Sequence, residues 1–190
     1  MKQFLLLTVL IGSMVMITSC GDDEEPSGGN GTEVLQLDGP NFTAPTLGEG
    51  FYEFAVRFTN LDLSPYVGES LTEISFYLYE MPSSLNLTIS PDLTLSEPGA
   101  IEYQQQVSSG NTNSWNTITL DEPYVIDGSP IWIGIQVNLT QLQQTVGCDE
   151  GPANANGDWL FDDLLGWLRF SDRTPESVNW NIRATVTDSN

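Results

Sequence analysis

The stretch Ile131-Trp132-Ile133-Gly134-Ile135-Gln136-Val137 decides the fold. Its odd-numbered positions are apolar and β-branched, whereas its even-numbered positions hold an indole, a glycine and an amide. Successive side chains of a strand point to opposite faces of a sheet, so this alternation predicts a strand with one face against a hydrophobic core. Gly134 is expected to leave space on the other face, beside Trp132.

The same alternation recurs in other stretches, namely residues 52–58, 74–79, 85–90 and 180–186. In the first of these it points Glu53 and Arg57 away from the core. Turn-forming residues separate the stretches: Pro82-Ser83, Ser90-Pro91-Asp92, Pro98-Gly99, Ser109-Gly110-Asn111, Asp127-Gly128-Ser129-Pro130 and Asn156-Gly157-Asp158. Half-buried strands at this spacing predict an all-β protein, an antiparallel two-sheet sandwich with a jelly-roll-like order. Helix is expected only as a turn at Leu61 to Tyr66.

The N-terminal residues predict where the protein is held. Lys2 gives a positive start, an apolar run extends from Phe4 to Ile17, and Thr18-Ser19 precede Cys20. The run is shorter than the roughly 20 residues of a membrane-spanning helix, which favours a cleaved signal. A cysteine after small residues predicts lipidation of Cys20. An ordinary cleaved signal and a retained helix are the alternatives.

The chain is accordingly divided into three segments. Residues 1–19 are predicted to be a lipoprotein signal peptide, and residues 20–32 the lipidated cysteine with a flexible acidic, Gly/Ser-rich linker. Residues 33–190 are predicted to form a single β-sandwich domain, because they are numerous enough for a core of their own. Several acyl chains on Cys20, palmitate among them, would hold the protein stably on a membrane.

The acidic run Asp22-Asp23-Glu24-Glu25 follows the cysteine directly. A block of like charges is typical of a solvated linker. It also resembles the residues after the lipidated cysteine in lipoproteins of Bacteroidetes, where acidic residues accompany export to the outer leaflet of the outer membrane. That resemblance implies an outer-membrane anchor with the domain exposed at the cell surface. A periplasm-facing anchor is the alternative.

Composition excludes several classes of function. The formal net charge is −21, which repels nucleic-acid phosphates and anionic lipid headgroups. The chain has no histidine, and its lysine lies in the predicted signal, so imidazole bases, Ser-His-Asp triads and Schiff-base chemistry are absent. Paired carboxylates remain, as in glycoside hydrolases, but no motif singles out a pair. The protein is therefore not expected to be an enzyme.

Cys148 is the cysteine left once Cys20 carries lipid. It has no partner for an internal disulfide, and without histidine it has no base to activate it. We expect a small buried or loop residue. Pairing between two molecules is the alternative.

Short motifs follow one another along the domain: Phe54 to Thr59, Leu63 to Gly68, Leu71 to Tyr77, Trp115 to Leu120, Ile131 to Gly134, Cys148 to Pro152, Gly157-Asp158 and Asn179 to Ala184. Together they resemble the β-sandwich modules that recur in Bacteroidetes surface lipoproteins and beside secreted peptidases and gingipain-type adhesin regions. The resemblance covers roughly Phe51 to Val186. It implies an accessory or adhesive module without catalysis.

One loop carries oxygen donors at a spacing that suits calcium. Its candidate ligands for a structural Ca²⁺ are Asp149, Glu150, Asn154, Asn156 and Asp158. Alternate oxygen-bearing positions with a glycine are typical of calcium loops. The alternative is a plain Asn/Gly/Asp turn between strands. No other cofactor is expected.

Four aromatic residues are predicted to project away from the core: Tyr77, Tyr79, Trp115 and Trp132. Exposed aromatics flanked by amides stack on sugar rings or anchor a partner protein. The alternative is that loops within residues 140–175 fold over this face and bury them. The tryptophans Trp159, Trp167 and Trp180 are assigned to core or loop packing.

These features together predict a non-catalytic cell-surface lipoprotein, a binding or adhesion module for a protein or glycan ligand. A structural envelope or assembly subunit is the alternative, and a carboxylate-based glycoside hydrolase is a further one. The expected partners are a membrane, reached through the lipid anchor, and a protein or carbohydrate ligand, with no nucleic acid.

Overall fold

The computed structural model describes residues 31–188. The predicted signal peptide, the lipidation of Cys20 and the acidic run after it lie outside this range. No helix within residues 31–188 is both long enough and apolar enough to cross a bilayer. The first strand begins at Thr32, the last residue of the predicted linker.

Strands make up most of the described chain. They are β1 (Thr32–Gln36), β2 (Thr46–Leu47), β3 (Gly50–Phe58), β4 (Ser70–Leu78), β5 (Ser84–Thr94), β6 (Glu97–Pro98), β7 (Tyr103–Gln106), β8 (Ser114–Val125), β9 (Ile131–Leu139), β10 (Gln143–Gln144), β11 (Trp159–Asp162), β12 (Gly166–Arg169) and β13 (Ile182–Thr187). The helical elements are short: α1 (Asn60–Leu63), η1 (Ser64–Tyr66) and η2 (Phe170–Asp172).

The predicted helical turn at Leu61 to Tyr66 is confirmed by α1 and η1. Thr59 caps α1, because its hydroxyl accepts a hydrogen bond from the backbone N–H of Asp62 while the Asp62 carboxylate accepts one from the backbone N–H of Thr59. This reciprocal pair satisfies two backbone donors at the helix start.

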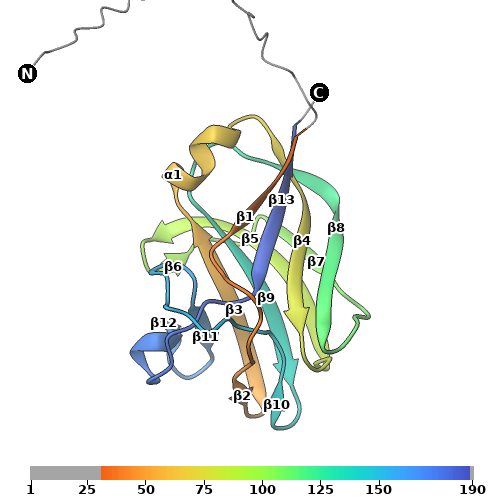
Figure 1. Ribbon diagram of the computed structural model, residues 1–190, viewed down its shortest axis with the longest axis vertical. Coiled ribbons are helices and arrows are strands. Elements are labelled where there is room, and N and C mark those ends of the chain that lie inside the picture. The colour runs from red at the N-terminus through yellow and green to blue at the C-terminus, as the bar shows by residue number, and fades with distance from the viewer. Residues whose placement is uncertain (1–30, 189–190) are drawn as a thin grey trace, which may run out of the picture.

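The strands form two main antiparallel sheets (Figure 1). One has the order β1-β13-β4-β8; the other has the order β12-β11-β3-β9-β5-β6, with β7 also paired to β5. A small pair, β10-β2, lies apart. When β1, β3, β4, β5, β7, β8, β9 and β13 are numbered one to eight, the sheets read 1-8-3-6 and 2-7-4-5, the jelly-roll order. The predicted fold class is confirmed.

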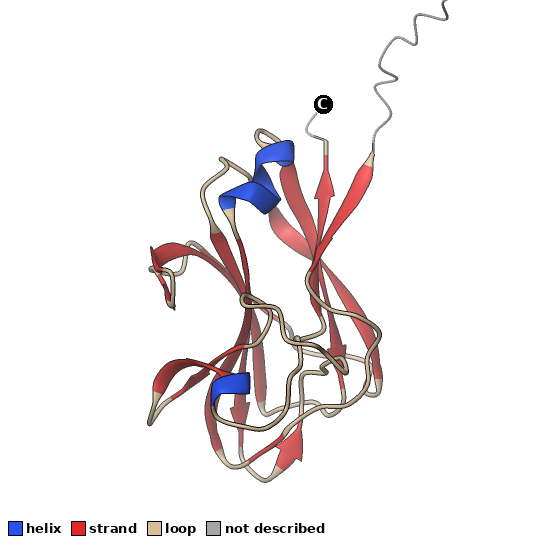
Figure 2. Ribbon diagram, turned by 60° about the vertical axis from the view of Figure 1, so that its left-hand side comes forward, coloured by secondary structure: helices blue, strands red, loops and turns tan. Residues whose placement is uncertain are grey.

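The core fills the space between the two layers, which Figure 2 shows side by side. Ile133, Ile135 and Val137 of β9 are buried there, as their alternation predicts. Phe54 of β3 meets Trp180 edge-on, with ring centroids 5.0 Å apart. Full burial of one such apolar side chain is worth about 1.5–3 kcal/mol, so these rows fix which face of each strand turns inward.

The predicted turn at Ser90-Pro91-Asp92 is wrong, because β5 continues through it to Thr94. The N–H of Asp92 donates to Pro130 beside β9, so the nitrogen of Pro91 faces the opposite side of β5. On that side β7 has ended and β6 begins, and the missing N–H of Pro91 breaks no ladder hydrogen bond. The chain turns instead after Thr94.

Candidate functional site

Two hairpins extend from the outer face of the larger sheet, β5–β6 and β11–β12, and both lie on the same side of the molecule in Figures 1 and 2. Between them is a groove of about 240 Å³. It is lined by Phe51, Glu53, Ser90, Pro98, Gly99, Ile101, Gln136, Phe161 and Trp167.

The floor of the groove is polar. Glu53 of β3 lies directly opposite Gln136 of β9 in the sheet register. The Gln136 amide donates to Glu53 Oε2 at 2.9 Å, and the Thr88 hydroxyl donates to Glu53 Oε1 at 2.7 Å. Gln104 in turn donates from Nε2 to Gln136 Oε1 at 3.1 Å. Two of these donors, the Gln136 amide and the Thr88 hydroxyl, bond the Glu53 carboxylate directly, and Gln104 supports the Gln136 amide.

Burial raises the pKa of Glu53, while the hydrogen bonds from Thr88 and Gln136 lower it by less. The carboxyl therefore takes up a proton more readily than a free glutamate does. No other charged side chain is among the residues that line the groove in the described part of the chain.

Gly134 makes this floor possible. A Cβ at this position would overlap Glu53 Oε1 and Thr88 Oγ1. The space predicted beside Trp132 is therefore present, and the Glu53–Thr88 hydrogen bond fills it. Glycine inside a strand is typical of such a close approach.

One wall of the groove is aromatic. Phe161 lies 6.1 Å from Phe51 and 5.7 Å from Trp167, measured between ring centroids. Trp167 in turn packs against Trp132 at 5.4 Å. The opposite wall is aliphatic, with Pro98 and the exposed Ile101. The groove is thus a slot with a polar floor and two apolar walls.

The prediction that Trp132 is exposed is wrong, since only 2% of its surface is accessible. The β11–β12 hairpin pairs with β3 and places Trp159 and Trp167 over it. This outcome matches the alternative that residues 140–175 cover the face. The Trp132 indole N–H donates to the Asp92 carboxylate, which also forms a two-point ion pair with Arg57.

The Arg57–Asp92 ion pair joins β3 to the part of β5 that begins the β5–β6 hairpin. Its shortest contact joins Arg57 Nη2 to Asp92 Oδ2 at 2.6 Å, and Arg57 is buried. Burial opposes ionisation of Asp92, but hydrogen bonds from Arg57 and Trp132 lower its pKa overall. The alternation in residues 52–58 predicts that Arg57 points away from the core. It does so, and it is buried by contacts with Asp92 and Asn156 on that outer face.

The other three predicted aromatics lie together on the outer face of the smaller sheet. Tyr77 lies 5.2 Å from Tyr79 and 6.0 Å from Trp115, between ring centroids. All three are half-buried, and the Arg183 guanidinium lies 4.2 Å from the Trp115 ring centroid. Trp132 belongs to the other sheet, so the predicted four-residue aromatic surface is wrong as one surface.

Two of the predicted calcium ligands, Asp149 and Asp158, have structural roles. The buried Asp149 carboxylate accepts hydrogen bonds from Gly39, Gly151 and Asn179. The buried Asp158 carboxylate accepts from Arg169 and the Ser171 N–H. The four hydrogen bonds to Asp149 use its acceptor positions, and the Arg169 guanidinium, 2.7 Å from Asp158, neutralises that carboxylate.

The remaining members of the predicted calcium set also do not converge. Asn154 accepts from the N–H of Asn156, Asn156 accepts from Arg57, and Glu150 is exposed. Within residues 31–188 no group of three or more His, Cys, Asp or Glu side chains is placed to hold a metal ion. The loop has the form of the alternative, an Asn/Gly/Asp turn, and the calcium prediction receives no support.

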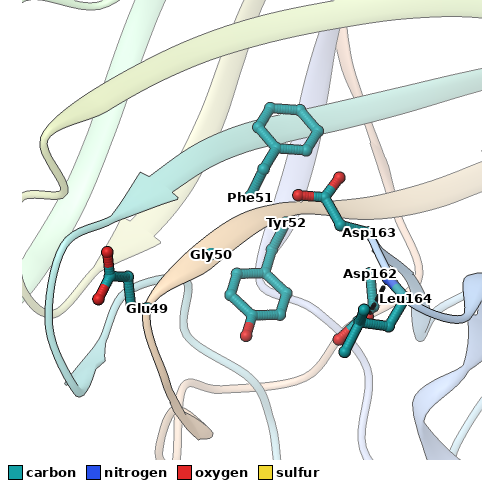
Figure 3. A pocket seen from close by; sticks show the side chains of 7 residues that line it. All are labelled: Glu49, Gly50, Phe51, Tyr52, Asp162, Asp163 and Leu164. Carbon is teal, nitrogen blue, oxygen red and sulfur yellow. Dashed lines mark hydrogen bonds between the residues drawn. The ribbon is translucent and has the colours of Figure 1, made fainter.

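A second hollow, of about 270 Å³, is lined by acidic side chains at the start of β3 and the β11–β12 turn. Figure 3 shows Glu49 on the far side of the Tyr52 ring from Asp162 and Asp163, so the three carboxylates do not converge. Burial and the charges of Asp162 and Asp163 raise the pKa of Tyr52. Asp162 accepts a hydrogen bond from the N–H of Leu164, which shapes the turn.

Cys148 is a small buried residue, as predicted, with 1% of its surface exposed. It forms β-bridges to Thr43 and Trp180. Burial, with the nearby charges of Asp149 and Glu176, raises the pKa of Cys148 to about 12. The thiol therefore stays protonated at neutral pH and is a poor nucleophile.

Fold and site together define an antiparallel jelly-roll sandwich with a polar-floored groove on one outer face. No protein-family model matches the chain. A search of curated proteins also gives no match. Among solved structures, the clostridial cysteine protease Cwp84, in a variant form after propeptide cleavage, is similar, with a TM-score of 0.62 and 13% sequence identity.

The likeness covers 83% of this chain and 40% of the clostridial chain, so this chain spans less than half the length of that protein. At such low identity the similarity shows the fold alone.

Sequence reasoning missed the groove. Glu53 and Gln136 were both predicted to face away from the core, but their positions opposite one another depend on the pairing of β3 with β9. Phe161 had no assignment, and Trp167 was assigned to packing. The available signal was Gly134, whose missing side chain marks the place where Glu53 and Thr88 meet.

Proposed function

We propose that this protein is a non-catalytic binding module, part of a cell-surface lipoprotein, that holds a protein or glycan ligand in the groove between the β5–β6 and β11–β12 hairpins. One observation carries the proposal: a polar, hydrogen-bonded floor lies between an aromatic and an aliphatic wall. Few convergent polar groups within apolar walls are typical of ligand sites.

The groove also supports the absence of catalysis. Hydrolysis of a glycosidic bond uses two carboxyl groups that face each other across the substrate. Among the residues that line the described groove, Glu53 is the one carboxylate. The chain has no histidine to act as base instead.

The proposed location rests on the N-terminal sequence. The apolar run before Cys20 and the acidic residues after it support a lipid anchor exposed at the cell surface. A net charge of −21 suits a protein that stays soluble there and is repelled by anionic headgroups.

A structural envelope or assembly subunit is the second candidate, and exposed leucines at the hairpin tips favour it. Leu95 is 76% exposed and Leu164 is 92% exposed. Two such tips would be buried in an assembly. Sedimentation velocity of the wild type and of Leu164→Asp tests this role. A wild-type oligomer that dissociates in the variant supports it, and a monomer in both proteins refutes it.

The binding function is tested by screening purified full-length protein on glycan and matrix-protein panels. Ile101→Trp fills the groove from an exposed wall position, and Val125→Trp, on the exposed end of β8, is the matched control. We expect binding that Ile101→Trp abolishes and Val125→Trp preserves. Absence of binding to every panel overturns the proposal. If Trp115→Ala abolishes binding and Ile101→Trp does not, the binding site lies on the smaller sheet.

A further inference from the structure

We propose that the groove binds a saccharide, with one pyranose ring in the slot, its hydroxyls on Glu53 and its C–H face on Trp167. This inference rests on the binding function proposed above and gives its ligand a chemical class.

The direction of the hydrogen bonds sets what the ligand must supply. Gln104 donates to Gln136, and Gln136 and Thr88 donate to Glu53. An ionised carboxylate has about four acceptor positions, and these donors use two of them. Glu53 therefore has acceptor capacity left, and the ligand has to bring O–H or N–H groups.

The walls favour a flat ligand with an apolar face. Phe51, Phe161 and Trp167 pack against one another along one wall, whereas Pro98 and Ile101 form the other. A pyranose ring has a C–H face for an indole and hydroxyls at its edge for the floor. Sites for an ammonium group typically surround it with aromatic faces. In this groove the aromatic rings lie along one wall only, which favours a saccharide over an ammonium ligand.

The sheet register extends the site beyond a single ring. Trp167 pairs with Phe161, Phe161 with Glu53, and Glu53 with Gln136. The row then continues through Asn86 and Gln106. At roughly 4.8 Å between strands this row is about 24 Å long. It leads from an aromatic end to an amide end, which suits an oligosaccharide lying across the strands.

The volume agrees with one ring held in the slot. The groove measures about 240 Å³. Sites that enclose drug-sized molecules usually span roughly 300–1,000 Å³. The rest of a longer saccharide would lie on the open amide row.

The test is a titration of full-length protein with two probe panels, neutral oligosaccharides and lysine-rich or quaternary-ammonium peptides. The variants are Glu53→Gln and Trp167→Ala, with Glu73→Gln and Trp115→Ala on the smaller sheet as matched controls. A charge-assisted hydrogen bond and a stacking contact are each worth about tenfold or more in affinity. We expect neutral oligosaccharides to bind, each groove variant to weaken binding about tenfold or more, and the controls to stay within about twofold.

Three results would overturn the saccharide assignment. Cationic peptides that bind in place of oligosaccharides, with Ile101→Trp blocking them, would keep the binding function but reject the ligand class. Oligosaccharide binding lost in Trp115→Ala and kept in Trp167→Ala would reject the site. Absence of binding to both panels and to matrix proteins would reject the binding function itself. Should Trp167→Ala not fold, Ile101→Trp replaces it, because Ile101 is exposed and its change leaves the tryptophan cluster intact.

Discussion

Gly134→Ala should damage the groove floor from within a central strand. The added Cβ would overlap the carboxylate of Glu53 and the hydroxyl of Thr88, which meet over Gly134. One of the two must move, and the hydrogen bond between them, 2.7 Å long in the wild type, is lost. Thr88 is 1% exposed, so its hydroxyl would have no access to water.

The cost follows from these contacts. A buried polar group left unsatisfied costs about 1–3 kcal/mol, and an overpacked site costs a similar amount. Replacing glycine by alanine returns about 0.4–1 kcal/mol by restricting the unfolded chain. The net expectation is a loss of about 1–5 kcal/mol in the free energy of unfolding, together with weaker ligand binding.

Urea denaturation followed by tryptophan fluorescence measures this loss. Gly48→Ala is the matched control: no heavy atom lies within 4 Å of a Cβ there, so it should show only the gain of about 0.4–1 kcal/mol from the restricted unfolded chain. A Gly134→Ala protein as stable as the Gly48→Ala protein would refute the description of the floor.

Four further predictions concern pH, metal and thiol chemistry. Because burial raises the pKa of Glu53, saccharide affinity should fall as the pH drops through that raised value, and Glu53→Gln should remove this pH dependence; isothermal titration between about pH 4 and pH 8 measures both. The same raised pKa means that ionised Glu53 lowers stability at neutral pH, so the wild type should gain stability relative to Glu53→Gln as the pH falls through the folded-state pKa. EDTA should leave the melting temperature unchanged within about 1 °C, because four hydrogen bonds use the acceptor positions of Asp149 and Arg169 neutralises Asp158; a fall of several degrees would contradict this assignment. Cys148 should stay unreactive towards an aromatic disulfide reagent until the protein unfolds, and rapid labelling of the native protein would show that its burial is wrong.

The sequence was sufficient for the parts of the fold that depend on alternation within one strand. Ile135 and Val137 turn inward because their neighbours along the chain are polar or small, and no knowledge of other strands is needed. The short helix after Thr59 is likewise local. Ser90-Pro91-Asp92 misled because the effect of a proline depends on what lies beside it, and Pro91 faces a place where β7 has ended.

The site could not be predicted because it depends on pairings between distant strands. Trp132 faces outward from the core, as its pattern indicates, yet the β11–β12 hairpin covers it. Glu53 and Gln136 meet only in the register of β3 with β9. The hydrogen bonds to Asp149 and Asp158 likewise come from distant N–H groups, such as those of Asn179 and Ser171, which the loop's own sequence does not reveal.

The most direct test of the groove is an NMR titration of full-length protein with a neutral oligosaccharide, following the indole N–H resonances. Single Trp→Phe changes assign the signals of Trp167 and Trp115. The saccharide proposal predicts that the Trp167 resonance shifts in a saturable way while that of Trp115 stays in place. A shift of Trp115 with Trp167 unmoved would contradict it.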